Sequence, residues 1–255
     1  MVATHHPLGL EEISAESWSV LERLGRALHL KNAELQPTLD AIVALAVQTI
    51  SSAQYAGLIL VERGQLQPQS TTGAPPHALD MLQQAIGTGP CIDAAREQAV
   101  IRIRDTSSDQ RWPAIAEQAA SLGVASMLCV PLWVDESRLG SLSLYSSRSS
   151  AFSDHDLQLT RLYATHAALA LSDAQRVAKL QTALRNRDVI GQAKGILMER
   201  SRLTPEGAFE RLSLASQTTN LKLATVAQHL VDTGELPGVP SLAEQASSGK
   251  TGGDR

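Results

Sequence analysis

A lysine lies between two glycines in the stretch RDVIGQAKGILME, residues 187–199, which otherwise has the composition of a helix. Each glycine inside a helix costs about 1 kcal/mol relative to alanine. The helical period places Arg187, Gly191, Lys194 and Met198 on one strip of the helix surface. Because glycine has no Cβ, Gly191 leaves bare backbone that a planar base can approach, while the ammonium of Lys194 can bind a phosphate. The spacing therefore predicts a nucleotide-binding strip.

Another side of the same helix is apolar and is predicted to face a core; it contains Val189, Ile190, Ala193, Ile196 and Leu197. Gly195 lies one residue round the helix from Lys194, and two explanations fit it equally well. It either opens the surface to a ligand or permits close packing against another helix. For Gly191 we favour the approach of a ligand.

The charge distribution favours an anionic partner for this region only. The chain of 255 residues has a net charge of −4, yet residues 185–222 carry seven basic and four acidic side chains. No apolar run reaches the roughly 18 residues that cross a bilayer, and the N-terminus lacks the order of a secretory signal. Two distant cysteines fit a reducing compartment. These features predict a soluble, cytoplasmic protein that does not contact a membrane.

Residues typical of catalysis or metal binding are scattered along the chain. There is no HExxH, GxSxG or Walker pattern, so we expect no enzyme activity, no metal and no cofactor. His155 is expected at the surface and His166 in helix packing. Cys91 is the candidate for lining a ligand pocket, although a small buried cysteine is the commoner role. Side chains of the loop around DQRWP are expected to stabilise the conformation of that loop, with Asp105 binding nearby backbone amides.

Residues 16–172 alternate between helical and strand patterns. Helical spacing is found over residues 17–30, 37–50, 76–86 and 112–123. Two hairpins are predicted, which turn at Arg63-Gly64 and at Asp135-Glu136-Ser137, together with a short strand in AVIRIRD. Strands enclosed by helices in this order predict an α+β domain with an antiparallel sheet.

Three motifs in this part of the chain resemble those of the GAF domains of actinobacterial regulators. They are GTGPCIDAAREQ, DTSSDQRWPAIAEQAASLGVASMLCVPL and GSLSLYSSRSSAFSDHDLQL, in that order. The resemblance covers roughly residues 35–172 and implies a curved antiparallel sheet with a ligand-sized pocket on one face and helices on the other. We therefore predict a GAF sensor domain over 16–172, after a disordered N-terminus at 1–15, with an unidentified small molecule as its candidate ligand.

One helix is predicted from Phe152 to about Leu203, with Ser153 as N-cap and Asp156 three residues later. Its length far exceeds the globular norm and suggests a coiled-coil connector over 173–186. An irregular apolar stripe would pair two parallel copies into a homodimer; it consists of Leu162, His166, Leu169, Val177, Leu180 and Leu184. The alternative is a helix folded back on its own domain.

The C-terminal part resembles an ANTAR domain, the RNA-binding output module of antiterminators. The matching run is NRDVIGQAKGILMER followed by SRLTPEGAFERLSLASQTTNLKLATVAQHLVDTG, where Thr204-Pro205 opens a helix, Asn220 ends it and Gly234 ends the next. The resemblance covers about residues 175–236 and implies three helices that bind paired RNA hairpins in nascent leader transcripts, so that no terminator forms. The tail, 238–255, is predicted to be disordered.

The resemblance and the strip together select the candidate RNA-binding residues: Arg187, Gly191, Gln192, Ala193, Lys194, Gly195, Met198, Ser216, Asn220 and Lys222. They would contact phosphates and splayed loop bases. Ser216 is equally explained by packing, and Phe209 is expected in the core, so no aromatic platform is predicted. Two alternatives remain. The last two helices can form a DNA-binding helix-turn-helix, although the last one, LKLATVAQHLVD, offers almost no Arg, Gln or Asn to read base edges. Alternatively, the C-terminal helices bind only protein.

Overall fold

The computed structural model describes residues 34–62 and 64–238. These residues divide into two compact units, with the boundary after Ala178. The predictions for residues 1–15, for a helix over 17–30 and for the tail beyond Gly238 lie outside the described residues. No helix within the two described ranges combines the length and apolarity that a bilayer crossing requires.

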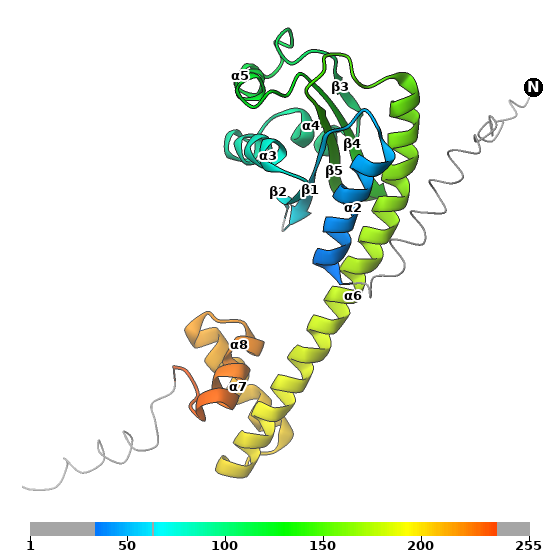
Figure 1. Ribbon diagram of the computed structural model, residues 1–255. Coiled ribbons are helices and arrows are strands. Elements are labelled where there is room, and N and C mark those ends of the chain that lie inside the picture. Colours follow the sequence, from blue (N-terminus) through cyan, green and yellow to red (C-terminus); the bar gives the residue numbers. More distant parts are fainter. Residues whose placement is uncertain (1–33, 63, 239–255) are drawn as a thin grey trace, which may run out of the picture. The chain divides into compact units, whose positions relative to one another are not determined.

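A five-stranded antiparallel sheet is the centre of the first unit (Figure 1). Its strands are β1 (Tyr55–Glu62), β2 (Gln65–Thr71), β3 (Ile101–Ile103), β4 (Ser126–Val134) and β5 (Ser137–Ser146), in the order β2-β1-β5-β4-β3. The pairs β1–β2 and β4–β5 are the two predicted hairpins, and β1 joins them by pairing with β5. The predicted α+β class with an antiparallel sheet is confirmed.

Alternate side chains of the strands pack into two separate cores, because successive residues of a strand point to opposite faces. On one face, Leu58 and Leu60 pack with α2 (Leu35–Thr49) and the first part of α6 (Asp154–Ser201). On the other face, Ile59 packs with α3 (Ala74–Ile86), α4 (Pro90–Glu97) and α5 (Pro113–Ser121). The periodicity of the sequence did not reveal α4, because eight residues give too few turns to show a helical period.

Helix α6 begins with the predicted reciprocal cap. The hydroxyl of Ser153 accepts from the amide of Asp156 at 3.1 Å, and the Asp156 carboxylate accepts from the amide and hydroxyl of Ser153 at 2.8 and 2.6 Å. The helix continues for 48 residues. Its first part buries Tyr163, whose hydroxyl donates to the carbonyl of Ile42 in α2 at 2.6 Å. The contact fastens α6 to α2 over one face of the sheet.

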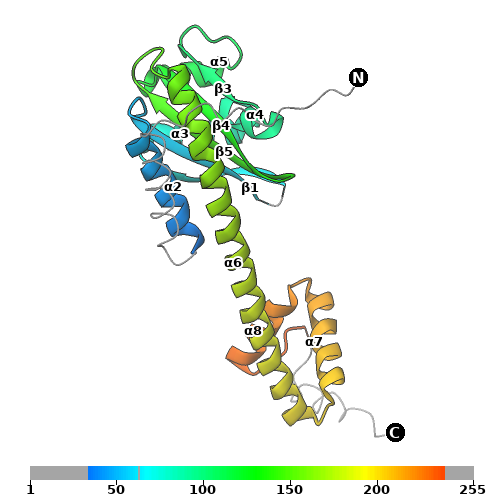
Figure 2. The same ribbon diagram turned by 90° about the vertical axis from the view of Figure 1, so that its right-hand side faces the viewer.

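Three helices form the second unit: the last part of α6, α7 (Pro205–Thr219) and α8 (Leu223–Thr233), labelled in Figure 2. The hydroxyl of Thr204 accepts from the amide of Gly207 at 3.2 Å and caps α7. Asn220 ends α7 in the left-handed conformation, with a φ of 54°, and Gly234 ends α8 in the same way. These boundaries were predicted from the capping residues alone.

Strands β1 and β5 approach each other closely at Gly140. A Cβ on Gly140 would lie 1.9 Å from the carbonyl oxygen of Ile59, and the φ of Gly140 is +151°. Alanine there would strain the backbone and push the strands apart, so we expect Gly140→Ala to lower the free energy of unfolding of the first unit by more than about 3 kcal/mol. Denaturant unfolding measures the change.

Gly87→Ala is the matched control, because Gly87 also has a positive φ, +75°, but open space around its Cβ position. It should cost only about 1 kcal/mol. Equal losses in the two variants would contradict the prediction and leave the backbone angle as the whole explanation.

Candidate nucleic-acid interface

Lys194 of α6 and Phe209 of α7 form the central contact of the candidate surface. The Nζ atom of Lys194 lies 6.0 Å from the centroid of the Phe209 ring, within the range of a cation–π interaction. Phe209 is 44% exposed, so the prediction that it belongs to the core was wrong. Ala208 and Leu212 occupy the face of α7 that packs on the other helices, and Phe209, one residue round from Ala208, is left at the edge of that face.

The two glycines of α6 leave its backbone uncovered on either side of Lys194. A Cβ added to Gly191 or Gly195 would meet nothing within 4 Å beyond the neighbouring residues and backbone of its own helix. Neither glycine therefore serves close packing against another element of the described chain. Arg187 and Gln192, which precede Lys194, are exposed as well.

Ala193 is the one predicted contact residue whose side chain the structure removes from the surface. It is fully buried with Ala208 and Ala227, between the three helices. The sequence analysis had placed Ala193 on the apolar side of the helix too, and packing is the role that the structure supports. Met198 is half-buried and packs against the same core, so only part of its thioether side chain can reach a ligand.

The other three candidates, Ser216, Asn220 and Lys222, gather at the turn between α7 and α8. The hydroxyl of Ser216 donates to the carbonyl of Leu221 at 2.6 Å, and the Ser216 carbonyl accepts from the Leu221 amide at 3.2 Å. Ser216 therefore holds the turn. Asn220 and Lys222 are exposed, and Leu221 between them is 44% exposed. The turn thus presents an amide, an ammonium and an apolar side chain together.

Arg200 is a cation of this basic region that stabilises the fold. Its guanidinium donates to the carbonyl of Gly234, at the C-terminal end of α8. A cation is favourable there because the unpaired carbonyls of a helix end carry partial negative charge. Arg200 is not among the predicted RNA-binding residues, and its bond to the end of α8 gives it a structural role.

The apolar stripe of α6 that was predicted to pair two copies lies on a different face from the one buried in the first unit. Tyr163, Ala167 and Leu171 are buried against the sheet side. The stripe residues divide into three that are exposed by 48–60%, Leu169, Leu180 and Leu184, and three that are half-buried, Leu162, His166 and Val177. Large exposed leucines along one helix are the kind of surface that a partner helix covers.

Cys91, the candidate for a ligand pocket, is fully buried in the first unit. A cavity of about 690 Å³ lies on the other face of the sheet, between the end of β4 and α6. Val130, Trp133, Arg161 and Leu169 are among its lining residues. Trp133 and Arg161 are exposed, whereas Val130 is buried.

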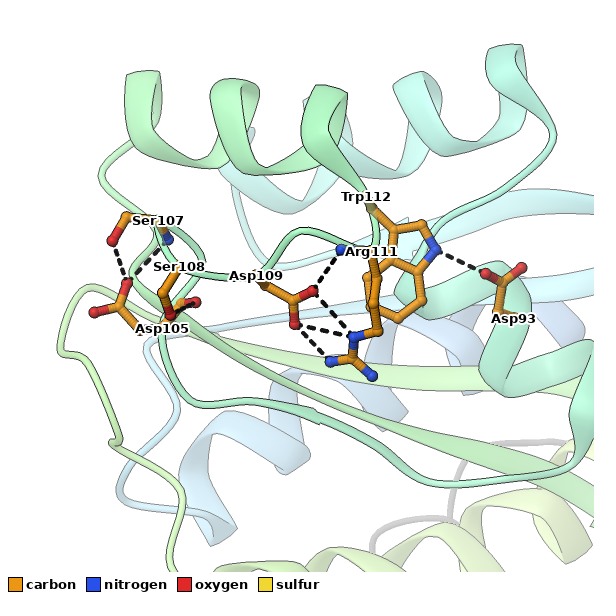
Figure 3. Close-up of polar contacts among 7 residues, drawn as sticks. All are labelled: Asp93, Asp105, Ser107, Ser108, Asp109, Arg111 and Trp112. Carbon is orange, nitrogen blue, oxygen red and sulfur yellow. Dashed lines mark hydrogen bonds and ion pairs between the residues drawn. The ribbon is translucent and has the colours of Figure 1, made fainter.

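The loop before α5 is held by its own side chains, as predicted (Figure 3). Asp109 accepts three hydrogen bonds from two nitrogen atoms of the Arg111 guanidinium, which lowers the pKa of that carboxyl. The same guanidinium lies 4.4 Å above the ring of Trp112, whose indole N–H donates to Asp93 at 2.8 Å. Asp105 accepts from the amide two residues on, at 2.9 Å. The polar side chains bind within the loop or to α4, so the loop is a structural motif.

Comparison with solved structures places the fold of the first unit. The GAF domains of phosphoenolpyruvate-protein phosphotransferases from Acinetobacter and Coxiella burnetii each have a TM-score of 0.51. They are 15% and 16% identical, and each alignment covers 65% of this chain and 99% of the other. A free methionine-R-sulfoxide reductase from Neisseria meningitidis, in complex with its substrate, gives 17% identity and a TM-score of 0.49, covering 69% and 99%. The likeness to the two GAF domains shows the fold alone.

Family models match both units. A GAF domain model matches residues 32–172, and an ANTAR domain model matches residues 178–231. No curated protein matches the chain. GAF and ANTAR domains are regulatory domains, and their presence in one chain describes a regulator with a sensor domain. The chain therefore belongs to the GAF–ANTAR regulators.

Proposed function

We propose that the ANTAR domain of this protein binds RNA stem-loops in nascent leader transcripts and so prevents a transcription terminator from forming. The match to the ANTAR family model supports an RNA-binding role for residues 178–231. One contact supports particular residues: the ammonium of Lys194 lies over the exposed ring of Phe209. A cation beside an exposed aromatic ring is the combination that single-stranded nucleic acid requires.

The chemistry of the surface suits an unpaired loop nucleotide. A base that stacks on the exposed part of the Phe209 ring has its phosphate within reach of the Lys194 ammonium. Stacking contributes about 1–3 kcal/mol per base, and the phosphate contact adds an attraction that weakens with salt. Proteins read RNA sequence through such splayed loop bases, because the major groove of an RNA duplex is too narrow for side chains.

The uncovered backbone at Gly191 extends this surface along α6. A base can lie flat against it, because the position of a Cβ there is empty. At the turn, the amide of Asn220 and the ammonium of Lys222 add groups for a base edge and a phosphate. Ser216 contributes by holding the turn through Leu221.

The exposed side chains of α8 do not favour the alternative, in which α8 reads DNA bases. Its exposed Gln228 donates its amide to Asp232 at 2.7 Å, so the amide is occupied by a neighbour on the same helix. The Asp232 carboxylate, which is exposed as well, would repel DNA phosphates. The side chains suited to nucleic acid lie on α6, α7 and the turn.

We infer that the active form is a homodimer, in which each copy holds one stem-loop of a pair. The exposed leucines of α6 support this assembly. Two linked sites on one RNA bind more tightly than one, because the second contact is made at a high effective concentration. The GAF domain would then act as sensor, as dimerisation platform, or as both.

A gel-shift titration of the full-length protein tests the proposal. The probes are an RNA with two stem-loops that carry small loops, the same RNA with one stem-loop deleted, and duplex DNA. We expect the order two stem-loops, one stem-loop, DNA, with affinity falling as salt rises. Preference for DNA would favour the helix-turn-helix, and no binding to any probe would favour a protein-binding output.

The contribution of the aromatic ring is tested by Phe209→Ala, which should weaken RNA binding by about 1–3 kcal/mol, since a stacking surface is lost. Phe209→Tyr should keep most of the affinity. Fluorescence anisotropy with a labelled stem-loop measures both. Leu214→Ala is the matched control, because Leu214 is a large exposed apolar residue on the same helix. Equal losses for Phe209→Ala and Leu214→Ala would contradict a specific role of the ring.

The open backbone predicts opposite effects of Gly191→Ala on stability and on binding. Helix propensity should raise the free energy of unfolding by about 0.5–1 kcal/mol, since the new methyl group meets no neighbour. The same methyl group should lower RNA affinity by covering the bare surface. Asn186→Ala, at an exposed position one turn earlier, is the control that raises helix propensity without covering a glycine. A stabilised Gly191→Ala variant with unchanged affinity would show that RNA does not use this surface.

The dimer is tested by placing a charge on the stripe. Leu180→Glu should shift the protein toward monomer in sedimentation velocity, because a carboxylate would be desolvated in an apolar seam. Its affinity for the two-stem-loop RNA should then fall to that for one stem-loop. Gln181→Glu adds the same charge at the neighbouring exposed position and should leave the dimer intact. Dimerisation of Leu180→Glu at the wild-type concentration would place the interface elsewhere.

A further inference from the structure

Two cysteines that are far apart in the sequence meet inside the GAF domain. The Sγ atom of Cys91, in α4, lies 3.7 Å from the Sγ atom of Cys129, in β4, and both residues are fully buried. This separation is that of two thiols in contact. A disulfide bond is about 2.05 Å long, so the sulfurs would have to move together by about 1.7 Å. The two elements already pack in one core.

Polar groups surround the thiol of Cys91 within an otherwise apolar core. The side-chain amide of Gln83 donates to its Sγ at 3.1 Å, and the hydroxyl of Tyr145 lies 3.3 Å from it. That hydroxyl also bonds the carboxyl of Asp80 at 2.7 Å. A chain of contacts thus runs from the carboxyl through the phenol to both sulfurs.

Two buried oxygen atoms beside this chain lack a hydrogen-bond partner among the described residues. They are Oδ2 of Asp80 and Oγ of Ser143. Ser143 is the cross-strand neighbour of Cys129, and Asp80 is bonded to Tyr145. Buried polar atoms are nearly always paired, by protein groups or by a small polar molecule. These two oxygen atoms add to the polar groups that surround the thiols in this core.

We propose that Cys91 and Cys129 are a redox site, at which hydrogen peroxide converts the two thiols into a reversible intrachain disulfide. One cysteine, as thiolate, attacks the peroxide and breaks its O–O bond, which yields a sulfenic acid and releases one water. The second thiol then attacks that sulfur, and the hydroxyl leaves with a proton as a second water. Two thiols are oxidised by two electrons, and one peroxide is reduced to two waters.

The surroundings determine the rate of this reaction. Burial raises the pKa of the Cys91 thiol well above its ordinary value, and contact with Cys129 raises it further. Little thiolate is present at neutral pH, so oxidation should be slow and should follow sustained exposure to peroxide.

Formation of the bond would change how α4 is held. The amide of Cys91 donates to the Gln83 side chain at 2.8 Å, and its carbonyl accepts from the Ser141 hydroxyl at 2.7 Å. A shift of the Cys91 sulfur toward Cys129 would alter its contact with the side-chain amide of Gln83 in α3. In exchange, the disulfide links positions 38 residues apart, which restricts the unfolded chain and stabilises the domain.

The experiment uses the full-length reduced protein. It is exposed to hydrogen peroxide, quenched and alkylated with iodoacetamide in denaturant, and then examined by mass spectrometry and by peptide mapping without reductant. We expect a loss of about 2 Da, no alkylated thiol and a cross-linked peptide pair containing Cys91 and Cys129, all reversed by dithiothreitol. The oxidised protein should also unfold at a higher temperature than the reduced protein.

Cys129→Ser tests the order of events. Without the second thiol no internal link can form, and Cys91 should be trapped by dimedone as a sulfenic acid, provided that circular dichroism shows a folded variant. The peroxide experiment on the wild-type protein tests the proposal without any variant. Two alkylatable thiols after prolonged exposure to an excess of peroxide would overturn it, as would a disulfide found only between chains or conversion to sulfinic acid without a link.

Discussion

The structure depends on one uninterrupted helix that belongs to two units and buries side chains in the core of each. Over the first part of α6, Tyr163 and its neighbours pack on the sheet and α2. Over the last part, Ala193 and Leu197 pack on α7 and α8. Residues 179–188, between these two contacts, are exposed all round. The helix there is held by its own backbone hydrogen bonds and not by packing on either core, and its exposed leucines are the surface that the proposed partner helix would cover.

The core of the ANTAR domain combines small and large apolar side chains. Ala193, Ala208 and Ala227 are fully buried there, together with larger aliphatic residues of all three helices. Phe209 lies outside this core, 44% exposed and beside Lys194. The two glycines of α6 are uncovered as well. The ring, the cation and the bare backbone therefore belong to the surface that the core leaves exposed.

The GAF domain separates its two faces by chemistry as well as by position. The face toward α2 and α6 is built from aliphatic side chains around Leu58 and Leu142. The face toward α3, α4 and α5 contains the thiols and, beside them, the carboxyl of Asp80, whose pKa is raised chiefly by burial. A carboxyl, a phenol and two thiols are reactive groups that lie together here, away from solvent. Their place is consistent with a domain whose task is to respond to a small molecule.

The sequence by itself determined the features that local physics controls. Caps at Ser153, Thr204 and Asn220, the two hairpins and the length of α6 follow from backbone preferences and periodicity, which act over a few residues. Packing across the chain decided the rest. Phe209 and Leu212 both fit the apolar spacing of a helix, yet Phe209 is exposed and Leu212 is buried. Which side of α7 faces the core depends on where α6 and α8 lie. Likewise, only the fold brings Cys91 to Cys129, since β4 reaches α4 through the arrangement of the sheet and not through any spacing in the chain.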